Sequence, residues 1–150
     1  MKIRHLVQKL INTYGTLDPF KLSEIQKIEV IHEYLGKFTW GYYSHINRIS
    51  FIHIHESLSE AETRFTCAHE LGHHYLHPKV NTPFLKKNTL LSLDKIEREA
   101  NQFAVELLIP DQLLIDGMTV YQAAEASGVP GELATLKKPP AYICRTWVGY

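Results

Sequence analysis

The segment FTCAHELGHHYLHP, residues 65–78, holds four of the nine histidines in this 150-residue chain. His69 and His73 are four residues apart, so on a helix they would lie one above the other, about 40° apart around the axis. Two imidazole nitrogens could then reach one metal ion. Glu70 would project about 100° away from His69. In an H-E-x-x-H motif this glutamate acts on the water at the metal without binding the metal itself, so Glu70 is the candidate general base.

A zinc ion is the expected cofactor of this histidine pair. Catalytic zinc usually has three protein ligands and leaves its fourth position to a water, whose pKa falls to about 7. The sequence therefore predicts one Zn²⁺ with a bound water, provided that the fold supplies a third ligand. The pair alone also fits an amphipathic helix whose histidines pack in the core or lie at its edge.

A third ligand is predicted in the later segment DKIEREANQFAVELL. Glu97 and Asn101 are four residues apart and lie on one edge of its apolar stripe, whereas Glu99 points toward the opposite edge. Glu97 is therefore the candidate ligand and Asn101 its support. Two alternatives stay open: Glu97 could cap the helix, because Asp94 and Glu97 have capping-box spacing, or Glu99 could be the ligand instead.

Three other residues of the histidine segment are expected to have no chemical role. His74 lies outside the ligand spacing and is expected at the surface. His77 is four residues after His73, but another protein ligand would displace the water, so a structural role is expected. Cys67 is expected to be a small buried residue rather than a thiolate ligand.

These side chains must be positioned by helices and strands, and the first half of the chain predicts both. Residues 2–13 have the apolar spacing of an amphipathic helix, and a second helix is expected to begin with Asp18 as its N-cap and Pro19 at its first position. Three short strands are predicted within residues 28–56, where β-branched and aromatic residues are concentrated. The last two should form a hairpin that turns at residues 45–47.

The histidine helix is predicted to begin near residue 60, because Ser59 and Glu62 have the spacing of a capping box, and to end before Pro78. Residues 78–92, in which Pro and Asn recur, are predicted to be a loop. Four side chains on the preceding strands are candidates to stabilise an oxyanion, although packing on a partly exposed sheet explains each of them better: Tyr42, Tyr43, His53 and His55.

The second half of the chain predicts a helix over residues 94–109 that is ended by Pro110, followed by two short helices broken at residues 128–130. Helices and strands in this order predict an α+β fold. We expect one domain over residues 1–150, with the following parts: a core with the site over about 1–110, C-terminal helices over 111–138, and a tail over 139–150 that is expected to fray.

Composition limits the setting. Hydrophobic residues make up 45% and charged residues 21%, which is typical of globular proteins. Sixteen basic and sixteen acidic residues cancel, so no global field attracts nucleic acid. The segment TVYQAAEASGVP is similar to half of a helix-turn-helix, but the chain has no matching basic stripe, so direct nucleic-acid binding is not expected.

Location is predicted from the cysteines and the amino terminus. Cys67 and Cys144 are far apart and unlike a disulfide framework, which favours a reducing compartment. The amino terminus lacks the continuous apolar run of a signal peptide. We therefore expect a cytoplasmic protein without a membrane partner.

The two segments together resemble the ImmA/IrrE family of zinc metallopeptidases. FTCAHELGHHYLH followed by EREANQFAVELLIP is similar to the family's H-E-L-G-H and E-x-E-A-N-x-F-A-x-x-L-L-x-P motifs, and RISFIHIHESLSEAETRF fits its strand, turn and lead-in helix. The resemblance covers about residues 45–110. It implies a compact zincin-like domain in which a small twisted sheet packs with helices.

The resemblance also implies the roles of the site residues. His69, His73 and Glu97 would bind zinc, Glu70 would be the base, and Asn101 would orient a ligand from behind. Related zincins have Asp where this chain has Asn101, and an amide holds a histidine less strongly than a carboxylate does.

The function that this family implies is a cytoplasmic endopeptidase of a phage or mobile element, whose substrate is a helix-turn-helix transcriptional repressor. Residues 48–55 are the strand along which a substrate would pair. A different class of function is an anti-repressor that binds its target without cleaving it and holds its metal for structure. A general peptidase without a regulatory role is the third possibility.

Overall fold

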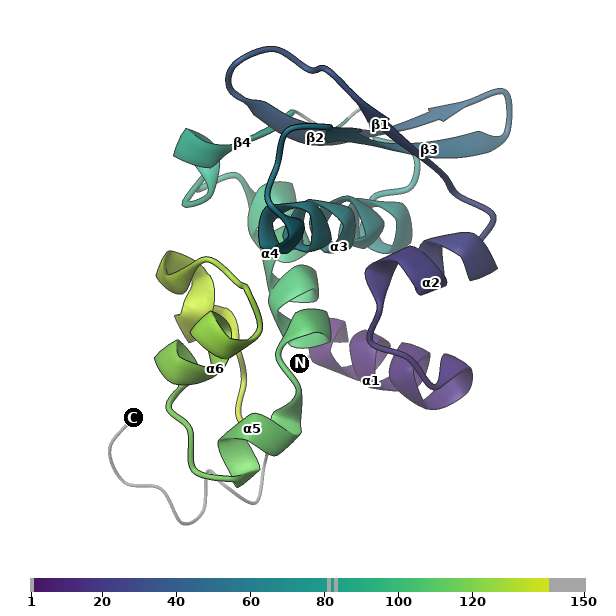
Figure 1. Cartoon of the computed structure of the whole chain (residues 1–150). Coiled ribbons are helices and arrows are strands. Elements are labelled where there is room, and N and C mark those ends of the chain that lie inside the picture. The colour runs from purple at the N-terminus through teal and green to yellow at the C-terminus, as the bar shows by residue number, and fades with distance from the viewer. Residues whose placement is uncertain (1, 81, 83, 141–150) are drawn as a thin grey trace.

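The computed structural model describes residues 2–80, 82 and 84–140, and places a four-stranded mixed sheet over a layer of helices (Figure 1). The fold is α+β, as the sequence predicts. The sheet has the order β1-β3-β2-β4, with β1 parallel to β3 and the other neighbours antiparallel. The strands are β1 Glu29–Glu33, β2 Thr39–Ile46, β3 Ile49–His55 and β4 Leu85–Lys86. The helices are α1 Lys2–Tyr14, α2 Pro19–Ile25, α3 Glu60–Leu76, α4 Lys95–Leu108, α5 Asp111–Ile115 and α6 Val120–Ala126, with short 3-10 helices η1 Lys87–Thr89 and η2 Gly131–Leu136.

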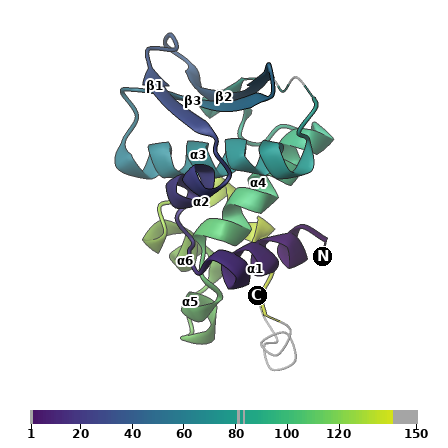
Figure 2. The ribbon, with the colours of Figure 1, turned by 90° about the vertical axis from the view of Figure 1, so that its right-hand side faces the viewer.

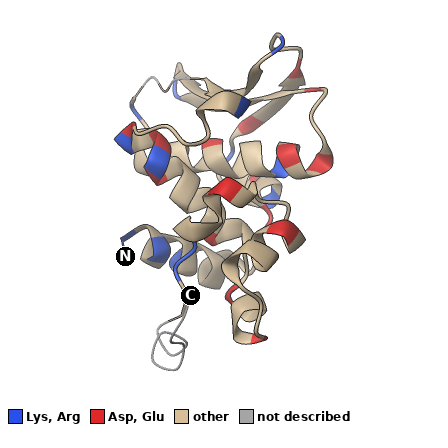
Figure 3. Ribbon diagram, turned by 90° about the vertical axis from the view of Figure 1, so that its left-hand side faces the viewer, with Lys and Arg blue, Asp and Glu red and all other residues tan. Residues whose placement is uncertain are grey.

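The elements are layered beneath the sheet. Helix α3 lies directly under the strands, α4 lies under α3, and α1 packs on the far side of α4 (Figures 1 and 2). The first turn of α3 is acidic, which suits the positive end of the helix dipole (Figure 3). Within the described residues, no helix has both the length and the apolar character that crossing a membrane requires.

The sheet can approach α3 closely because β2 has a glycine at the contact. A Cβ atom added to Gly41 would lie 2.5 Å from the Thr66 Cγ2 atom of α3 and 2.5 Å from the backbone oxygen of His53. No larger residue fits there without displacing backbone. The buried side chains Ile52 and Ile54 of β3 alternate with more exposed neighbours, so their face of the sheet forms the core.

Most predicted helix ends are confirmed. Asp18 caps α2, and Ser59 and Glu62 form a capping box at the start of α3. The hairpin between β2 and β3 is also confirmed, although its turn lies at Asn47 and Arg48, both with positive φ, rather than at residues 45–47. A two-residue turn with positive φ at both positions matches the natural twist of a hairpin.

The prediction that a substrate would pair along residues 48–55 is wrong. The strand β3 lies between β1 and β2 and is hydrogen-bonded on both sides. A strand with two partners has no free backbone groups for a third. Among the described residues, the edges of this sheet are β1 and β4.

Two other differences concern short elements. The predicted loop over residues 78–92 contains β4 and η1, and β4 pairs with β2 through Thr39 and Gly41. Helix α5 follows Pro110 as a third helical element within the C-terminal helices predicted over residues 111–138, and the break at residues 128–130 separates α6 from η2 as expected. Of the predicted tail, residues 141–150 lie outside the described residues.

The far end of α4 is held by a network of charged side chains. Arg4 of α1 contacts Glu106 of α4 at 2.7 Å and Asp111 of α5 at 2.7 Å. Lys137, which is buried, donates to Asp111 at 2.7 Å, and the backbone N–H of Lys138 donates to Glu106 at 2.8 Å. Burial acts to raise the pKa of Asp111, but the hydrogen bonds from Arg4 and Lys137 outweigh it and lower that pKa.

Substitution Asp111→Asn tests this network. We expect it to lower the free energy of unfolding at pH 7 by about 1–2 kcal/mol, since Asp111 is partly exposed and screened. A lowered pKa in the folded state stabilises the fold above the ordinary value of 3.8, and this contribution is lost as the pH falls below it. The difference between the two proteins, measured by urea unfolding, should therefore narrow below about pH 4.

The matched control is Asp116→Asn, which makes the same change on an exposed residue beside α5. It should leave the free energy of unfolding within about 0.5 kcal/mol of wild type. An Asp111→Asn effect that is equally large at pH 7 and pH 3 would show that the charge of Asp111 is not what stabilises the fold.

Candidate metal centre

The site lies where α3 and α4 pack most closely. A Cβ atom added to Gly72 of α3 would lie 3.1 Å from the Cβ atom of Phe103 on α4, which is tighter than ordinary contact. Glycine at this position lets the two helices approach without a side chain between them. This approach brings the first turns of α4 alongside the histidines of α3.

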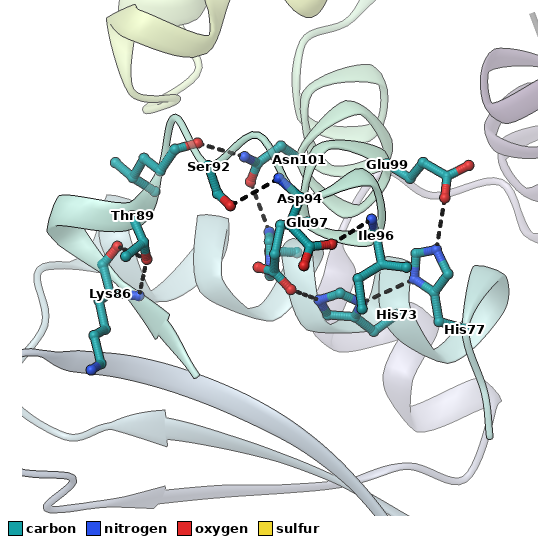
Figure 4. Close-up of polar contacts among 12 residues, drawn as sticks. His73, His77, Lys86, Thr89, Ser92, Asp94, Ile96, Glu97, Glu99 and Asn101 are labelled. Atoms are coloured by element: carbon teal, nitrogen blue, oxygen red, sulfur yellow. Dashed lines mark hydrogen bonds and ion pairs between the residues drawn. The ribbon is translucent and has the colours of Figure 1, made fainter. Parts of the chain in front are cut away.

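One carboxylate contacts both histidines of the motif. Glu97 Oε2 lies 3.1 Å from His69 Nε2, and Glu97 Oε1 lies 2.9 Å from His73 Nε2. The two histidines are fully buried and Glu97 is 6% exposed. Figure 4 shows the Glu97 carboxylate directed from α4 toward His73. Two imidazole nitrogens and one carboxylate therefore converge at one buried place.

The electrostatics of this place favour a positive charge. Burial acts to raise the pKa of Glu97, but hydrogen bonds from His69 and His73 lower it to about 2. Burial acts to lower the pKa of His69, yet the carboxylates of Glu70 and Glu97 outweigh it and raise that pKa. In His73, burial dominates and lowers the pKa. A centre that keeps one carboxylate ionised in the protein interior is suited to a cation.

Glu70 is buried without a hydrogen bond. Its exposure is 0%, and neither carboxylate oxygen has a partner among the described residues. Burial raises the pKa of Glu70 to about 8. Buried ionisable groups are normally satisfied, so a carboxyl group without a partner indicates a functional site. The donor atoms of His69, Glu70 and His73 lie within 4.8 Å of one another.

This set of donors fits a zinc ion. Zinc binds imidazole nitrogen and carboxylate oxygen in protein sites, often as two histidines and one glutamate. Both Glu70 and Glu97 lie close enough to His69 and His73 to be candidates for the carboxylate ligand. Glu97 contacts the Nε2 atoms of both histidines, whereas Glu70 contacts neither within hydrogen-bond distance.

His69 is held from behind by an amide. Its Nδ1 atom lies 2.8 Å from Asn101 Oδ1, and Asn101 Nδ2 donates to the backbone oxygen of Leu90 at 2.8 Å. Because the amide nitrogen is occupied by Leu90, the amide oxygen must face His69 and accept from its Nδ1–H. The Nε2 atom of His69 is thereby directed toward Glu97.

The structure separates the alternatives for the acidic residues of α4. Asp94 caps the helix alone, because its Oδ1 accepts from the Ile96 N–H at 3.0 Å while Glu97 faces the histidines. Glu99 Oε1 contacts His77 Nε2 at 3.0 Å and is directed away from Glu97 (Figure 4). The same contact gives buried His77 a polar partner, in keeping with the structural role predicted for it.

The expectation that His74 lies at the surface is wrong. His74 is half-buried, and its Nδ1 atom lies 3.0 Å from the hydroxyl of Tyr43, which also contacts Ser50 Oγ at 3.0 Å. Burial lowers the pKa of His74. No local pattern indicates this contact, because Tyr43 belongs to a strand that is remote from His74 in the chain. Cys67 is buried as expected, and burial raises the pKa of its thiol to about 12.

The candidates for oxyanion stabilisation are divided between the two faces of the sheet. Tyr43 pairs with Ile52 on the face that covers α3. Tyr42 and His53, one position along each strand, project from the opposite face and stack at 4.1 Å between ring centroids. His55 contacts the backbone oxygen of Gly36 at 2.7 Å. Of these four residues, Tyr43 is the one whose ring points into the layer that contains the site.

Comparisons with known proteins show which family this chain resembles along most of its length. The profile of the IrrE N-terminal-like domain, a peptidase family designated M78, matches residues 23–135. A protein of Bacillus phage phi105 named uncharacterized immunity region protein 2 is 45% identical over an alignment 139 residues long, which covers 90% of this chain and 88% of that protein. Metallopeptidase ImmA of Bacillus subtilis strain 168 is 34% identical over an alignment 143 residues long, which covers 90% of this chain and 83% of ImmA.

Substitution Gly72→Ala tests whether close packing of α3 on α4 positions the site. We expect the added methyl group to displace Phe103 and Glu97, which lowers the free energy of unfolding by about 1–3 kcal/mol. The better helix propensity of alanine offsets about 1 kcal/mol of this loss. Zinc affinity is measured by competition with a chelator. The loss of zinc-binding free energy should exceed the net loss in the free energy of unfolding. Gly131→Ala is the control, since an added Cβ atom there meets nothing within 4 Å. Unchanged zinc affinity in Gly72→Ala would show that the site does not depend on this contact.

Proposed function

The chain belongs to the peptidase family of the IrrE N-terminal-like domain and is on that ground a metallopeptidase, and we propose that it is an endopeptidase with one zinc ion held by His69, His73 and Glu97. The observation that supports this assignment most directly is the contact of one Glu97 carboxylate with the Nε2 atoms of both histidines. Two histidines and a glutamate leave one position for a water, which hydrolysis requires.

Peptide hydrolysis also requires a group that moves protons, and we assign this role to Glu70. When bound, the zinc ion would act as a Lewis acid toward the peptide carbonyl and lower the pKa of water. The positive charge of the bound ion would favour the ionised form of Glu70, whose carboxylate oxygen takes a proton from the attacking water and later delivers it to the nitrogen of the leaving amine. Both oxygens of Glu70 lack a partner among the described residues, so no protein hydrogen bond must be broken for this transfer.

Asn101 is a positioning residue in this proposal. Its oxygen accepts from His69 Nδ1–H at 2.8 Å, which leaves the lone pair of His69 Nε2 for the metal. An outer hydrogen bond of this kind fixes both the tautomer and the orientation of a histidine ligand.

The proposed substrate is a helix-turn-helix repressor of a phage or mobile element. This proposal rests on the family resemblance and is supported by the relative from phage phi105, which is named as an immunity region protein. An extended peptide would pair along β4, which lies beside β2 at the sheet edge, and not along the enclosed β3. We further propose that the protein acts in the cytoplasm, where such a repressor binds DNA.

The burial of the site favours a second candidate function. His69, Glu70 and His73 are each 0% exposed, so a peptide reaches Glu70 only after neighbouring residues move. A protein that binds the repressor without cutting it, with a metal that supports the fold, would need no such access. The partnerless carboxylate of Glu70 favours the peptidase, because a purely structural centre gains nothing from it.

Substitution Glu70→Gln distinguishes the two functions. The amide keeps the size of the side chain but cannot take a proton from water, so cleavage of a helix-turn-helix repressor encoded beside this gene should fall by about 10²–10⁴-fold. Zinc content, measured by mass spectrometry of the purified protein, should stay at that of wild type. The control is Glu125→Gln, an exposed residue of α6, which should cleave as wild type does. A Glu70→Gln protein that still inactivates the repressor fully, without cutting it, would contradict the peptidase and support the binding protein.

A further inference from the structure

A hydrogen-bonded chain connects His73 to the surface of the molecule. His73 Nδ1 lies 3.0 Å from His77 Nδ1, and His77 Nε2 lies 3.0 Å from Glu99 Oε1 (Figure 4). Exposure rises along this chain, from 0% at His73 and 8% at His77 to 33% for the side chain of Glu99. The opposite nitrogen of His73, Nε2, faces Glu97 at 2.9 Å. His73 is therefore hydrogen-bonded through Nδ1, and its Nε2 atom lies beside the Glu97 carboxylate.

The end of α3 places His77 in this position. The residue is the C-cap of the helix, with φ −136° and ψ 51°, and its backbone N–H donates to the oxygen of His73 at 2.8 Å. Pro78 follows, and a residue before proline is kept out of the helical region. The helix therefore ends at His77 while its last backbone hydrogen bond still holds that residue against His73, one turn earlier. Glu99 reaches the same point from α4.

With neutral histidines, an ionised Glu99 and a cation between His73 Nε2 and the Glu97 carboxylate, the hydrogen-bonded residues allow one assignment of protons. The Glu99 carboxylate can only accept, so His77 Nε2 carries a proton and donates it. The His77 Nδ1 atom is then an acceptor and must receive the proton of His73 Nδ1–H. This leaves the lone pair of His73 on Nε2, the nitrogen that faces Glu97. The carboxylate at the surface thus determines which nitrogen of His73 can bind a cation.

We propose that His77 and Glu99 are positioning residues that fix the tautomer and orientation of His73 for metal binding, an inference that rests on the zinc site proposed above. His77 does for His73 what Asn101 does for His69. The two supports differ: Asn101 is a neutral amide anchored to the backbone of Leu90, whereas His77 is backed by a carboxylate. These hydrogen bonds also explain why His77 is not a ligand. Its two nitrogens contact His73 Nδ1 and Glu99, and neither faces the place between His69 Nε2 and His73 Nε2.

The affinity for zinc of the metal-free protein, titrated at pH 7 against a chromogenic chelator, tests this role. His77→Leu removes the acceptor, and loss of an outer partner of this kind lowers metal affinity by about 10–100-fold. His77→Asn should restore most of the affinity, because its side-chain oxygen takes the place of Nδ1, as in the Asn101 contact. The zinc affinity of Glu99→Ala should lie between those of the two His77 variants, because His77 remains but its tautomer is no longer fixed.

Two controls separate positioning from support of the fold. His5→Leu changes an exposed histidine of α1 and should bind zinc as wild type does. The urea midpoints of the metal-free proteins should differ little between His77→Leu and His77→Asn, although their zinc affinities differ. Nitrogen-15 NMR of the zinc-loaded wild type should show the proton of His77 on Nε2.

The possible results distinguish this inference from the proposed function. Wild-type protein that binds no zinc would overturn both. Wild-type protein that binds zinc while His77→Leu binds it equally tightly would overturn the role of His77 alone. A His77→Asn protein as weak as His77→Leu would likewise contradict it, because the acceptor would have been restored without effect.

Discussion

The contact of Glu97 with both histidines across the α3–α4 interface is the interaction on which the rest of the structure depends. A carboxylate and two imidazoles can share one buried place only if two helices hold them there, because each group would otherwise be better solvated in water. Gly72 allows the approach, and the sheet above α3, closely seated through Gly41, removes the site from water. The opposite end of α4 is held to α1 and α5 by the contacts of Arg4 with Glu106 and Asp111. The helix that presents Glu97 is thus fixed at both ends.

Around this centre the outer nitrogens of the two histidines have hydrogen-bond partners, whereas His73 Nε2, Glu97 Oε1 and both oxygens of Glu70 have none among the described residues. Asn101 and His77 hold the outer nitrogens of the two histidines, so the inner nitrogens are left to face Glu97. Glu70 is buried beside them without a partner among the described residues. A carboxyl group that is buried without a hydrogen bond lowers the stability of the folded protein. Proteins keep such destabilising groups where a reaction requires them. This contrast is the physical basis for distinguishing a hydrolytic centre from a structural one.

Local patterns predicted much of the fold and of the site. Helical spacing placed His69 and His73 on one face of α3, and the same reasoning separated Glu97 and Asn101 from Glu99. Capping residues such as Ser59 predicted where the helices begin. The features that were missed depend on contacts between residues remote in the chain. Nothing local shows that β3 is enclosed by β1, that the two residues of β4 form a strand, or that Tyr43 half-buries His74. The partnership of His77 with Glu99 likewise appears only once α3 and α4 are packed.

The most direct test of the central claim is anomalous diffraction at the zinc edge from crystals of the zinc-loaded protein. We expect one ion for each chain, bound by the Nε2 atoms of His69 and His73 and by a carboxylate oxygen of Glu97, at about 2.0–2.2 Å. Glu70 should lie beside the ion without binding it. An ion bound by Glu70 in place of Glu97, or one enclosed by four protein ligands that include His77, would contradict the account.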